Sequence, residues 1–347
     1  MDFKNYKNVF GSLCREKEYD ESVIIKLLDY AERLNSQNLP IIYNIDHLSQ
    51  TLNIETRYIE RFLSSNKRTK YYYTFKVPKK NNRGIRIISE PVPNLKYIQY
   101  WILNNILNKI DVHSSATAYV RKKNIYENVK VHRDKKIVFK VDIENFFGSI
   151  NSKNIFNIFN NLGYSVKISE VLTEICLLEN SLPQGAPTSA YLSNIHLFEF
   201  DKIISDYCTS NNIQYTRYSD DLTFSGDFNH SELKCFVVDE LSKLNLNVNN
   251  KTKVMNSHQK QYVTGVVVNK VIQLSKEERN NFRHILYIFK KENGIENYLK
   301  FYKVSQTKKN SFLRSILGKV YFGLYLNSND KVLIELKKML KKYIKKN

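Results

Sequence analysis

Two adjacent aspartates, Asp220 and Asp221, stand inside an otherwise apolar and aromatic stretch, residues 217–224. Neighbouring carboxylates repel each other, so a pair held in a buried strand needs a compensating cation, and a divalent metal is the usual one. Aspartate is also a common turn residue, so the pair alone is equally compatible with a hairpin turn that binds no metal. The order of the surrounding motifs decides between these two interpretations.

A third carboxylate, Asp142, ends a β-branched run, residues 137–142, that predicts a buried strand. In two-metal phosphoryl transfer, carboxylates from separate strands hold two magnesium ions about 3.5 to 4 Å apart, and these activate the attacking hydroxyl and stabilise the leaving oxygen. We therefore predict that Asp142, Asp220 and Asp221 are the catalytic residues and bind two Mg²⁺ ions, for which Mn²⁺ could substitute. Asp142 and Asp220 are the expected direct ligands, and Asp221 is a further ligand or a charge that shapes the site.

Further motifs flank these aspartates in a defined order. A Leu-Pro-Gln-Gly turn, residues 182–185, precedes the aspartate pair, and Lys251 and a Val-Thr-Gly sequence, residues 263–265, follow it. The series resembles the palm of a reverse transcriptase, with its aspartate strand, Leu-Pro-Gln-Gly turn, Tyr-x-Asp-Asp hairpin, downstream lysine and primer-grip hairpin. Several matches in this order are far more specific than any one of them.

Two features narrow the resemblance to the retron reverse transcriptases. Asn128 and His132 match the Asn-Ala-x-x-His element found upstream of the first aspartate in that family, with Val129 in place of the usual alanine. The Val-Thr-Gly sequence matches a signature of the same family, and Ser219 replaces the more common alanine before the aspartate pair. The resemblance runs from about residue 79 to about residue 269.

The resemblance implies an α+β fold with the right-hand architecture of polymerases: fingers, an antiparallel-sheet palm and a basic helical thumb. The implied regions are an N-terminal helical region over residues 1–66, fingers over 67–135, a palm with inserted fingers elements over 136–274, and a thumb over 275–347.

Residue patterns predict several elements independently of the resemblance. Apolar residues at helical spacing predict short helices before residue 66, a helix over 93–110 and a second long helix after Pro187. Aromatic and β-branched runs predict a hairpin over 71–91, with its turn at 79–84. The chain from residue 276 onward is predicted to be mainly helical.

The resemblance assigns nucleotide-binding roles to five residues. Arg86 is expected to grip the incoming triphosphate, a task that suits a permanently charged planar group, although it could be a solvent-exposed strand arginine. Phe147 is expected to be the steric gate that excludes a 2′-hydroxyl, with core packing as its alternative role. Gln184 and Gly185 are expected to contact the template–nucleotide pair, and Lys251 to lie near the triphosphate. Phe146 is the better candidate for core packing, because strand neighbours face opposite sides.

A second set of residues is expected to bind nucleic acid. Its members are Asn128, His132, Val263, Thr264 and Gly265. A lone histidine is more often a structural hydrogen-bonding residue, and the first two, one helical turn apart, could order a loop that recognises RNA. The Val-Thr-Gly hairpin could instead be simple strand packing.

The charge of the chain indicates a polyanionic partner. Lysine and arginine number 54 against 34 acidic residues, which gives a net charge of +20, and basic groups displace counterions from phosphates. Residues 275–347 hold 18 basic and 6 acidic residues, so this end is the expected nucleic-acid clamp. A solvated helix face is the alternative for any single lysine.

The four cysteines are dispersed, which favours neither a zinc site nor a disulfide framework. No signal-peptide segment and no apolar run of about 18 residues is visible, so we expect a cytoplasmic protein without membrane insertion.

The resemblance implies partners as well as an activity. Retron reverse transcriptases bind a structured non-coding RNA, prime from the 2′-hydroxyl of an internal guanosine, use deoxynucleoside triphosphates, and make branched RNA-linked single-stranded DNA (msDNA). They commonly act with an effector protein encoded nearby, in anti-phage defence. The alternatives are a group II intron, diversity-generating or abortive-infection reverse transcriptase, an RNA-binding scaffold that restrains a toxin, and a metal-dependent nuclease.

Overall fold

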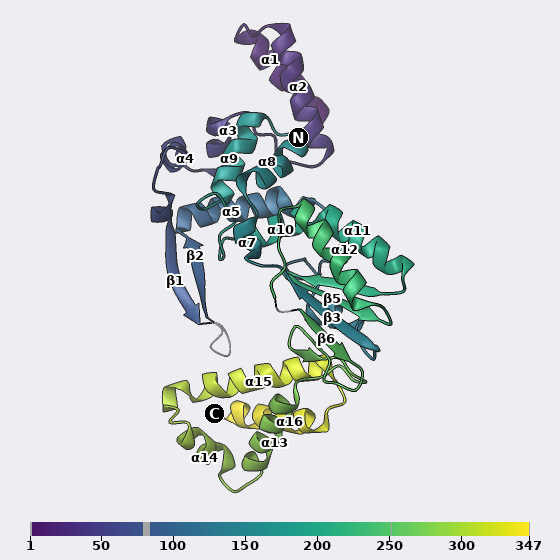
Figure 1. Cartoon of the computed structure of the whole chain (residues 1–347). Helices are drawn as coiled ribbons and strands as arrows, with labels where there is room; N and C mark the ends of the chain where they lie inside the picture. Colours follow the sequence, from purple (N-terminus) through teal and green to yellow (C-terminus); the bar gives the residue numbers. More distant parts are fainter. Residues whose placement is uncertain (1, 79–83, 251, 347) are drawn as a thin grey trace. The chain divides into compact units, whose positions relative to one another are not determined.

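The computed structural model describes residues 2–78, 84–250 and 252–346. Its chain divides into two compact units. The first unit comprises Met1–Arg121, Ile143–Ile204 and Phe236–Asn249, and the second comprises Lys122–Asp142, Ser205–Cys235 and Asn250–Asn347. Figure 1 shows the elements of both units, which are described separately below.

The N-terminal part of the first unit is helical, as predicted. Its helices are α1 (Phe3–Glu16), α2 (Glu21–Ser36), α3 (Ile45–Leu52) and α4 (Thr56–Leu63). In α2 the buried residues Ile24, Ala31 and Leu34 recur at helical spacing, so one face of the helix packs into the unit. The side chain of Asn44 accepts a hydrogen bond from the His47 N–H at 2.8 Å and so begins α3.

A long antiparallel hairpin follows these helices, and it confirms the prediction for residues 71–91. Its strands are β1 (Tyr72–Pro78) and β2 (Ile85–Pro91). Gly84 has a φ of +107°, a conformation that glycine adopts without strain. The rest of the predicted turn, residues 79–83, lies outside the described residues.

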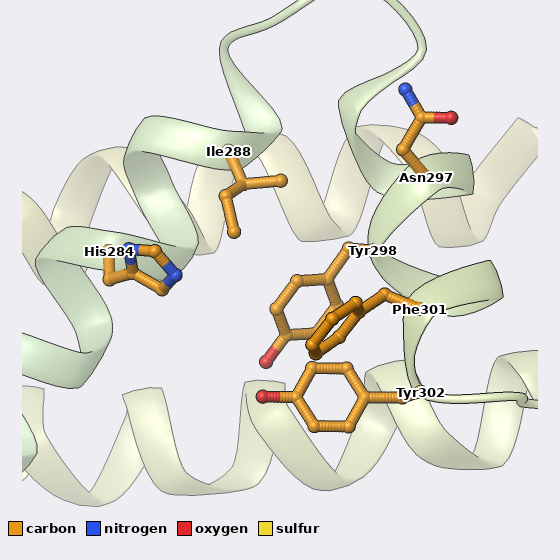
Figure 2. Close-up of a pocket in the computed structure, with 6 residues that line it drawn as sticks. All are labelled: His284, Ile288, Asn297, Tyr298, Phe301 and Tyr302. Atoms are coloured by element: carbon orange, nitrogen blue, oxygen red, sulfur yellow. The ribbon is translucent and has the colours of Figure 1, made fainter.

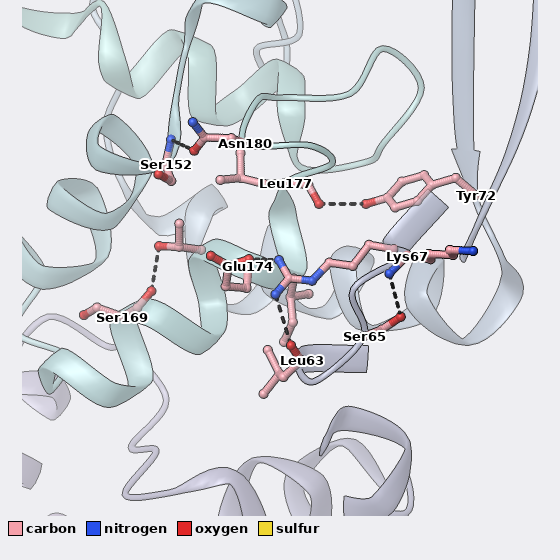
Figure 3. Close-up of polar contacts among 12 residues, drawn as sticks. Leu63, Ser65, Lys67, Tyr72, Ser152, Ser169, Glu174, Leu177 and Asn180 are labelled. Carbon is pink, nitrogen blue, oxygen red and sulfur yellow. Dashed lines mark hydrogen bonds and ion pairs between the residues drawn. The ribbon is translucent and has the colours of Figure 1, made fainter. Parts of the chain in front are cut away.

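The base of this hairpin is fixed by a buried polar network. The Gln99 side chain donates to the Tyr72 hydroxyl at 3.1 Å and to the Ile175 carbonyl at 2.8 Å. The Tyr72 hydroxyl donates to the Leu177 carbonyl at 3.4 Å (Figure 3). These bonds join β1 to helices α5 (Pro93–Asn105) and α9 (Val166–Cys176).

Two of the predicted helices are shorter than expected. The helix predicted over 93–110 ends at Asn105 and continues as a 3₁₀ turn, η3 (Leu107–Lys109). The Asn105 side chain donates to the Trp101 carbonyl at 2.9 Å, and such asparagine bonds compete with helix continuation. The long helix predicted after Pro187 is two helices, α10 (Ser189–His196) and α11 (Phe198–Ser210), which meet at Leu197.

The remaining helices of the first unit are short. They are the 3₁₀ helix η1 (Arg68–Tyr71), α7 (Phe146–Ser149) and α8 (Ser152–Asn161). Two further helices, α11 and α12 (His230–Lys243), have residues in both units.

The second unit contains a four-stranded antiparallel sheet with the strand order β4-β5-β3-β6. The strands are β3 (Ile137–Asp142), β4 (Gln214–Tyr218), β5 (Asp221–Gly226) and β6 (Lys253–Asn256). The predicted buried strand over 137–142 is therefore confirmed as β3, an inner strand of this sheet. The rings of Phe139 and Phe224 stack between β3 and β5 with centroids 6.0 Å apart.

The C-terminal part of the second unit is helical, as predicted. Its helices are α13 (Lys276–Phe289), α14 (Gly294–Phe301), η4 (Gln306–Lys308), α15 (Lys309–Leu326) and α16 (Lys331–Lys346). They share one apolar core with the small hairpin β7 (Tyr262–Val263) and β8 (Val266–Val267) and with Val138 of β3. A methyl group on Gly323 would lie 2.5 Å from Leu333, so this glycine lets α15 approach α16 closely. No helix among the described residues is long and apolar enough to cross a membrane.

Candidate active site

The predicted catalytic aspartates meet at one end of the sheet in the second unit. Asp142, the last residue of β3, lies directly opposite Asp221, the first residue of β5. Residues paired in this way have Cβ atoms about 4.5 to 5.5 Å apart. Ser219 and Asp220 form the two-residue turn that connects β4 to β5, and Asp221 follows directly as the first residue of β5. The aspartate pair therefore does lie at a hairpin turn, and the register also brings it beside the third carboxylate.

The turn before these carboxylates is held by a buried arginine. Ser219 has a φ of +63°, which is unfavourable for a residue with a side chain and persists only where the surroundings enforce it. Arg217 is fully buried and donates from Nη1 to the Ser219 carbonyl at 3.1 Å. The sequence analysis did not select Arg217, although a charged residue inside an apolar strand pattern is a usable signal.

Lys140 supplies positive charge beside the paired carboxylates. Its Nζ lies 2.6 Å from Oδ2 of Asp221, and both side chains are mostly buried. Burial raises the pKa of Asp221, the charge of Asp142 acts in the same direction, and Lys140 opposes both. The sequence analysis also missed Lys140, which lies two residues before Asp142 and therefore on the same face of β3.

The three carboxylates fit the kind of magnesium site in which the substrate supplies some of the metal ligands. Mg²⁺ in nucleotide-processing enzymes is typically held by one or two carboxylates, with phosphate oxygens and water completing the octahedron. Asp142 and Asp221 present two carboxylates side by side, and Asp220 adds a third in the adjoining turn. Within residues 2–78, 84–250 and 252–346, no three His, Cys, Asp or Glu side chains form a ready-made metal cluster.

His132 is a buried structural residue that joins the two strands of the β4–β5 hairpin. It follows α6 (Ile125–Lys130), and its ring nitrogens lie 2.7 Å from the Ser225 hydroxyl and 2.8 Å from the Thr216 hydroxyl. Burial lowers the pKa of His132 to about 3, and Lys135 and Lys140 contribute, so the ring is neutral at pH 7. The structure thus gives His132 the hydrogen-bonding position that the sequence analysis weighed against RNA recognition.

The two motifs that narrowed the resemblance contact each other. The Asn128 side chain of α6 donates to the Thr264 hydroxyl at 3.4 Å. Thr264 and Gly265 form the turn between β7 and β8, with φ values of +46° and +87°. Asn128 and Val263 are buried, whereas Gly265 is exposed at the tip of the turn.

A tyrosine beside this turn is surrounded by lysines. The Nζ atoms of Lys140, Lys253 and Lys260 lie 5.7, 5.3 and 6.0 Å from the centroid of the Tyr262 ring. Lys253 also donates to the Tyr262 hydroxyl at 2.6 Å. Because Lys140 contacts Asp221 as well, this positive cluster adjoins the carboxylates. Lys251, the lysine predicted near the triphosphate, lies outside the described residues.

Three predicted nucleotide-binding residues of the first unit, Arg86, Gln184 and Gly185, lie on β2 or against it. The Ser89 N–H of β2 donates to the Gln184 carbonyl at 2.7 Å. Gly185 has a φ of +119°, and a methyl group there would lie 3.0 Å from both the Ile88 side chain and the Ser89 carbonyl oxygen. Arg86 is exposed on the same strand, three residues before Ser89. The structure therefore places Arg86 on the strand to which the Pro-Gln-Gly turn is bonded.

Phe146 and Phe147 differ in burial, as expected, but not for the expected reason. Phe146 is 4% exposed, whereas Phe147 is only partly buried. Both belong to the short helix α7, so the assumption that they are strand neighbours was wrong. A methyl group on Gly148 in α7 would lie 2.5 Å from the Asn145 side chain, so that side chain would have to move.

The C-terminal helices of the second unit carry an aromatic cavity of about 230 Å³. It is lined by His284 and Ile288 of α13 and by Asn297, Tyr298, Phe301 and Tyr302 of α14 and its C-terminal end. Figure 2 shows the three aromatic rings gathered on one side, with His284 and Ile288 opposite them. Phe301 is 79% exposed, which is unusual for a phenylalanine that serves only the core.

Comparison with known proteins identifies the class of enzyme. Residues 77–268 match the family described as reverse transcriptase (RNA-dependent DNA polymerase). This match covers more than half of the chain, and the protein is therefore an RNA-directed DNA polymerase with the right-hand polymerase fold.

Individual relatives identify a narrower family within that class. The reverse transcriptase of retron Ec86 from Escherichia coli is 32% identical over 241 residues, which cover 68% of this chain and 74% of that protein. The reverse transcriptase of retron Se72 from Salmonella heidelberg is 32% identical over 330 residues, covering 88% and 86%. A solved structure of Candida albicans telomerase with a fragment of telomeric RNA aligns with a TM-score of 0.43 and 12% identity, over 83% of this chain and 66% of that one. The chain belongs to the retron reverse transcriptases.

Proposed function

We propose that this enzyme reverse-transcribes a cognate structured non-coding RNA from an internal 2′-hydroxyl and makes branched RNA-linked single-stranded DNA. The direct pairing of Asp142 with Asp221 at the end of the sheet is the observation that carries the catalytic part of this proposal. Family membership supports the retron-specific part, as do Asn128, His132 and the Val-Thr-Gly turn.

In the proposed reaction, Asp142, Asp220 and Asp221 hold Mg²⁺, or Mn²⁺ in its place. The metal supplies charge neutralisation and lowers the pKa of the attacking hydroxyl. Lys140 favours the ionised form of Asp221, because its charge opposes the effects of burial and of Asp142 on the Asp221 pKa. Arg217 fixes the turn that carries Asp220 through its bond to the Ser219 carbonyl.

The first unit would supply the nucleotide contacts. We assign Arg86 to the triphosphate, Phe147 to exclusion of the 2′-hydroxyl, and Gln184 with Gly185 to the template–nucleotide pair. The bond between Ser89 and Gln184 supports this assignment, because it fixes the turn against the strand that carries Arg86. Lys251 retains the role implied by the family resemblance, near the triphosphate.

The second unit would hold the RNA and the growing DNA. We assign the β7–β8 turn and the lysines around Tyr262 to the phosphate backbone, since lysine binds phosphate as a point charge. Buried Asn128, His132 and Val263 would act by holding that turn and the catalytic hairpin in place. The basic helices after residue 275 and their aromatic cavity would contact the structured RNA, because exposed aromatic rings stack on unpaired bases.

The proposal includes a biological setting. It places the enzyme in the cytoplasm, with an effector protein encoded nearby, and gives the RNA–DNA product a part in anti-phage defence. The retron relatives support this setting.

The test is synthesis by the purified protein with the RNA transcribed beside its gene, Mg²⁺ and deoxynucleotides. The expected product is DNA covalently joined to the RNA, so that ribonuclease treatment leaves a short branched remnant on the DNA. Asp220→Asn should abolish the product and leave RNA binding intact. Unbranched DNA would refute internal priming, and RNA cleavage without deoxynucleotides would indicate a nuclease.

A further inference from the structure

An open cavity of about 500 Å³ lies in the first unit, where α4 ends and β1 begins. Three cations line it, Arg61, Lys67 and Lys70, together with the polar side chains Ser64, Ser65 and Asn66. All three cations are exposed, and none of the described residues that line the cavity is acidic. Its donors therefore face solvent without an internal counter-ion.

The positive charge is concentrated at this point of the chain. Residues 56–71 hold five basic residues and one acidic residue, whereas residues 1–55 hold six basic and nine acidic residues. The helices before the cavity are thus slightly acidic, although the whole chain has a net charge of +20. General basicity of the chain does not account for this local excess.

The cations of the cavity differ from other surface cations of the first unit. Lys7, Arg15 and Lys96 each contact a glutamate within 2.6 Å. Across the residues that the structure describes, Arg61, Lys67 and Lys70 form no ion pair. Three like charges around one depression repel each other, and a bound anion would relieve that repulsion.

The segment that joins α4 to β1 carries Lys67 and, in the 3₁₀ helix η1 (Arg68–Tyr71), Lys70, and it is anchored by Arg68. Arg68 donates from Nη2 to the Leu63 carbonyl at 3.1 Å, forms an ion pair with Glu174 and lies 5.5 Å from the Phe62 ring centroid. The Lys67 N–H donates to the Ser65 hydroxyl at 3.3 Å, and Figure 3 shows this bond. The segment is therefore preorganised, so little ordering entropy would oppose binding.

The cavity suits a phosphate backbone better than a base. Tyr71 is its one aromatic lining residue, and the Phe62 ring packs edge-on against Tyr71 at 5.0 Å. Lys70 lies over the Tyr71 ring with its Nζ 5.3 Å from the centroid. Both contacts obstruct base stacking on that ring, whereas the cations, hydroxyls and amide offer several donors to phosphate oxygens.

We propose that this cavity binds consecutive phosphates of an RNA strand and so gives the enzyme a sequence-independent RNA contact outside its catalytic aspartates. The inference rests on the proposed function for its ligand, because an RNA-directed polymerase must hold RNA. It does not depend on the chemistry at Asp142, Asp220 and Asp221.

The test is the salt dependence of RNA binding by the full chain. The variant Arg61→Gln/Lys67→Gln/Lys70→Gln should lower the slope of log affinity against log salt by about 2, since each single-strand phosphate contact contributes about 0.7. The matched control Lys4→Gln/Lys17→Gln/Lys26→Gln removes the same charge from exposed positions in the N-terminal region and should leave the slope unchanged. Equal slopes for the two variants would overturn the proposal.

A chemical footprint gives an independent readout. Bound RNA should protect Lys67 and Lys70 from acetylation while Lys4 and Lys26 stay reactive, and inorganic phosphate alone at millimolar concentration should not give this protection. Full reactivity of Lys67 and Lys70 in the RNA complex would refute the RNA contact, and equal protection by phosphate alone would replace it with a free-anion site.

Extension of a short, saturating, pre-annealed primer–template separates this inference from the proposed function. The cavity variant should extend it at the wild-type rate, because the catalytic aspartates are unchanged. If the wild-type protein fails to extend the primer, the proposed polymerisation is contradicted, and the RNA-binding result can still be interpreted. If the cavity variant shows both the wild-type extension rate and the wild-type salt slope, the RNA contact at the cavity is refuted and the proposed polymerisation is unaffected.

Discussion

The side chain of Asn128 donates a hydrogen bond to the hydroxyl of Thr264, which lies 136 residues further along the chain. Thr264 is β-branched and has a φ of +46°, a conformation that β-branched residues rarely adopt. The bond thus links the buried Asn128 of helix α6 to a strained turn at the tip of the β7–β8 hairpin.

This relationship predicts that Asn128 and Thr264 are energetically coupled. The single variants Asn128→Ala and Thr264→Ala should each lower the free energy of unfolding, and the double variant should lose less than the sum, by about 0.5 to 1.5 kcal/mol. Urea unfolding of the four proteins measures the coupling. Strictly additive losses would mean that this hydrogen bond does not hold the turn.

A second prediction concerns His132 and acid stability. The pKa of His132 is depressed to about 3 from an ordinary value of 6.5, so the unfolded chain binds the extra proton. This group therefore favours the folded state fully above about pH 6.5, and its contribution is lost progressively as the pH falls towards 3.

The variant His132→Leu should consequently lose less stability between pH 7 and pH 5 than the wild type, although it is less stable at pH 7 because the Thr216 and Ser225 hydroxyls lose a partner. Urea unfolding at the two pH values measures this difference. His258→Leu is the matched control, since His258 is exposed. A wild-type pH dependence in His132→Leu would show that His132 is not the buried neutral group described here.

A third prediction concerns Gly185, whose added methyl group would lie 3.0 Å from the Ser89 carbonyl oxygen in a backbone conformation suited to glycine. Gly185→Ala should cost about 1 to 3 kcal/mol of local strain and displace the Gln184 turn. We expect the KM for deoxynucleotides to rise severalfold while RNA affinity stays constant.

Gly318→Ala is the control for this variant. Nothing lies within 4 Å of a methyl group added to Gly318 in α15, and alanine favours helix, so activity should be unchanged. Wild-type nucleotide kinetics in Gly185→Ala would contradict the role assigned to this turn.

The main features of the site could be predicted from the sequence because they follow from short-range rules. Asp142 ends a β-branched run, and Asp220 and Asp221 sit at a hairpin turn, so both positions are readable from strand and turn patterns. Their convergence followed from the order of the motifs, and the register of β3 with β5 confirms that Asp142 and Asp221 converge.

The features that the sequence did not predict depend on contacts between strands or on side chains that compete for backbone hydrogen bonds. Lys140 acts through a diagonal contact with Asp221, 81 residues further along the chain, which requires the register of β3 with β5. The position of Arg217 inside an apolar strand marks it as unusual, but only its burial and its bond to the Ser219 carbonyl show what it does. The helix predicted over 93–110 ends early, at Asn105, where the side chain competes for a backbone carbonyl. The spacing of apolar residues gives no information about such competition.

A fourth prediction tests the charge balance around Asp221. Lys140 opposes the rise in the Asp221 pKa, so Lys140→Met should raise that pKa further. The acid limb of the rate profile at subsaturating Mg²⁺ should then move to higher pH, because a protonated carboxyl does not bind the metal. Lys136→Met is the control, since Lys136 pairs with exposed Asp227. An unmoved acid limb would exclude Lys140 from the control of metal binding.

The paired carboxylates also predict opposite effects on stability and activity. Asp142 and Asp221 repel each other, so Asp142→Asn should not destabilise the metal-free protein and could raise its melting temperature. Added Mg²⁺ should raise the melting temperature of the wild type but not that of Asp142→Asn, because a ligand stabilises only the state that binds it. DNA synthesis by Asp142→Asn should fall by about 10³-fold or more, since a catalytic metal contributes several kcal/mol.

Asp227→Asn is the control for this variant. It removes an exposed carboxylate beyond the other end of β5 and should keep both the Mg²⁺ stabilisation and the DNA synthesis of the wild type. Equal Mg²⁺ stabilisation of Asp142→Asn and the wild type would show that the metal binds elsewhere, and the catalytic assignment of the paired carboxylates would fail.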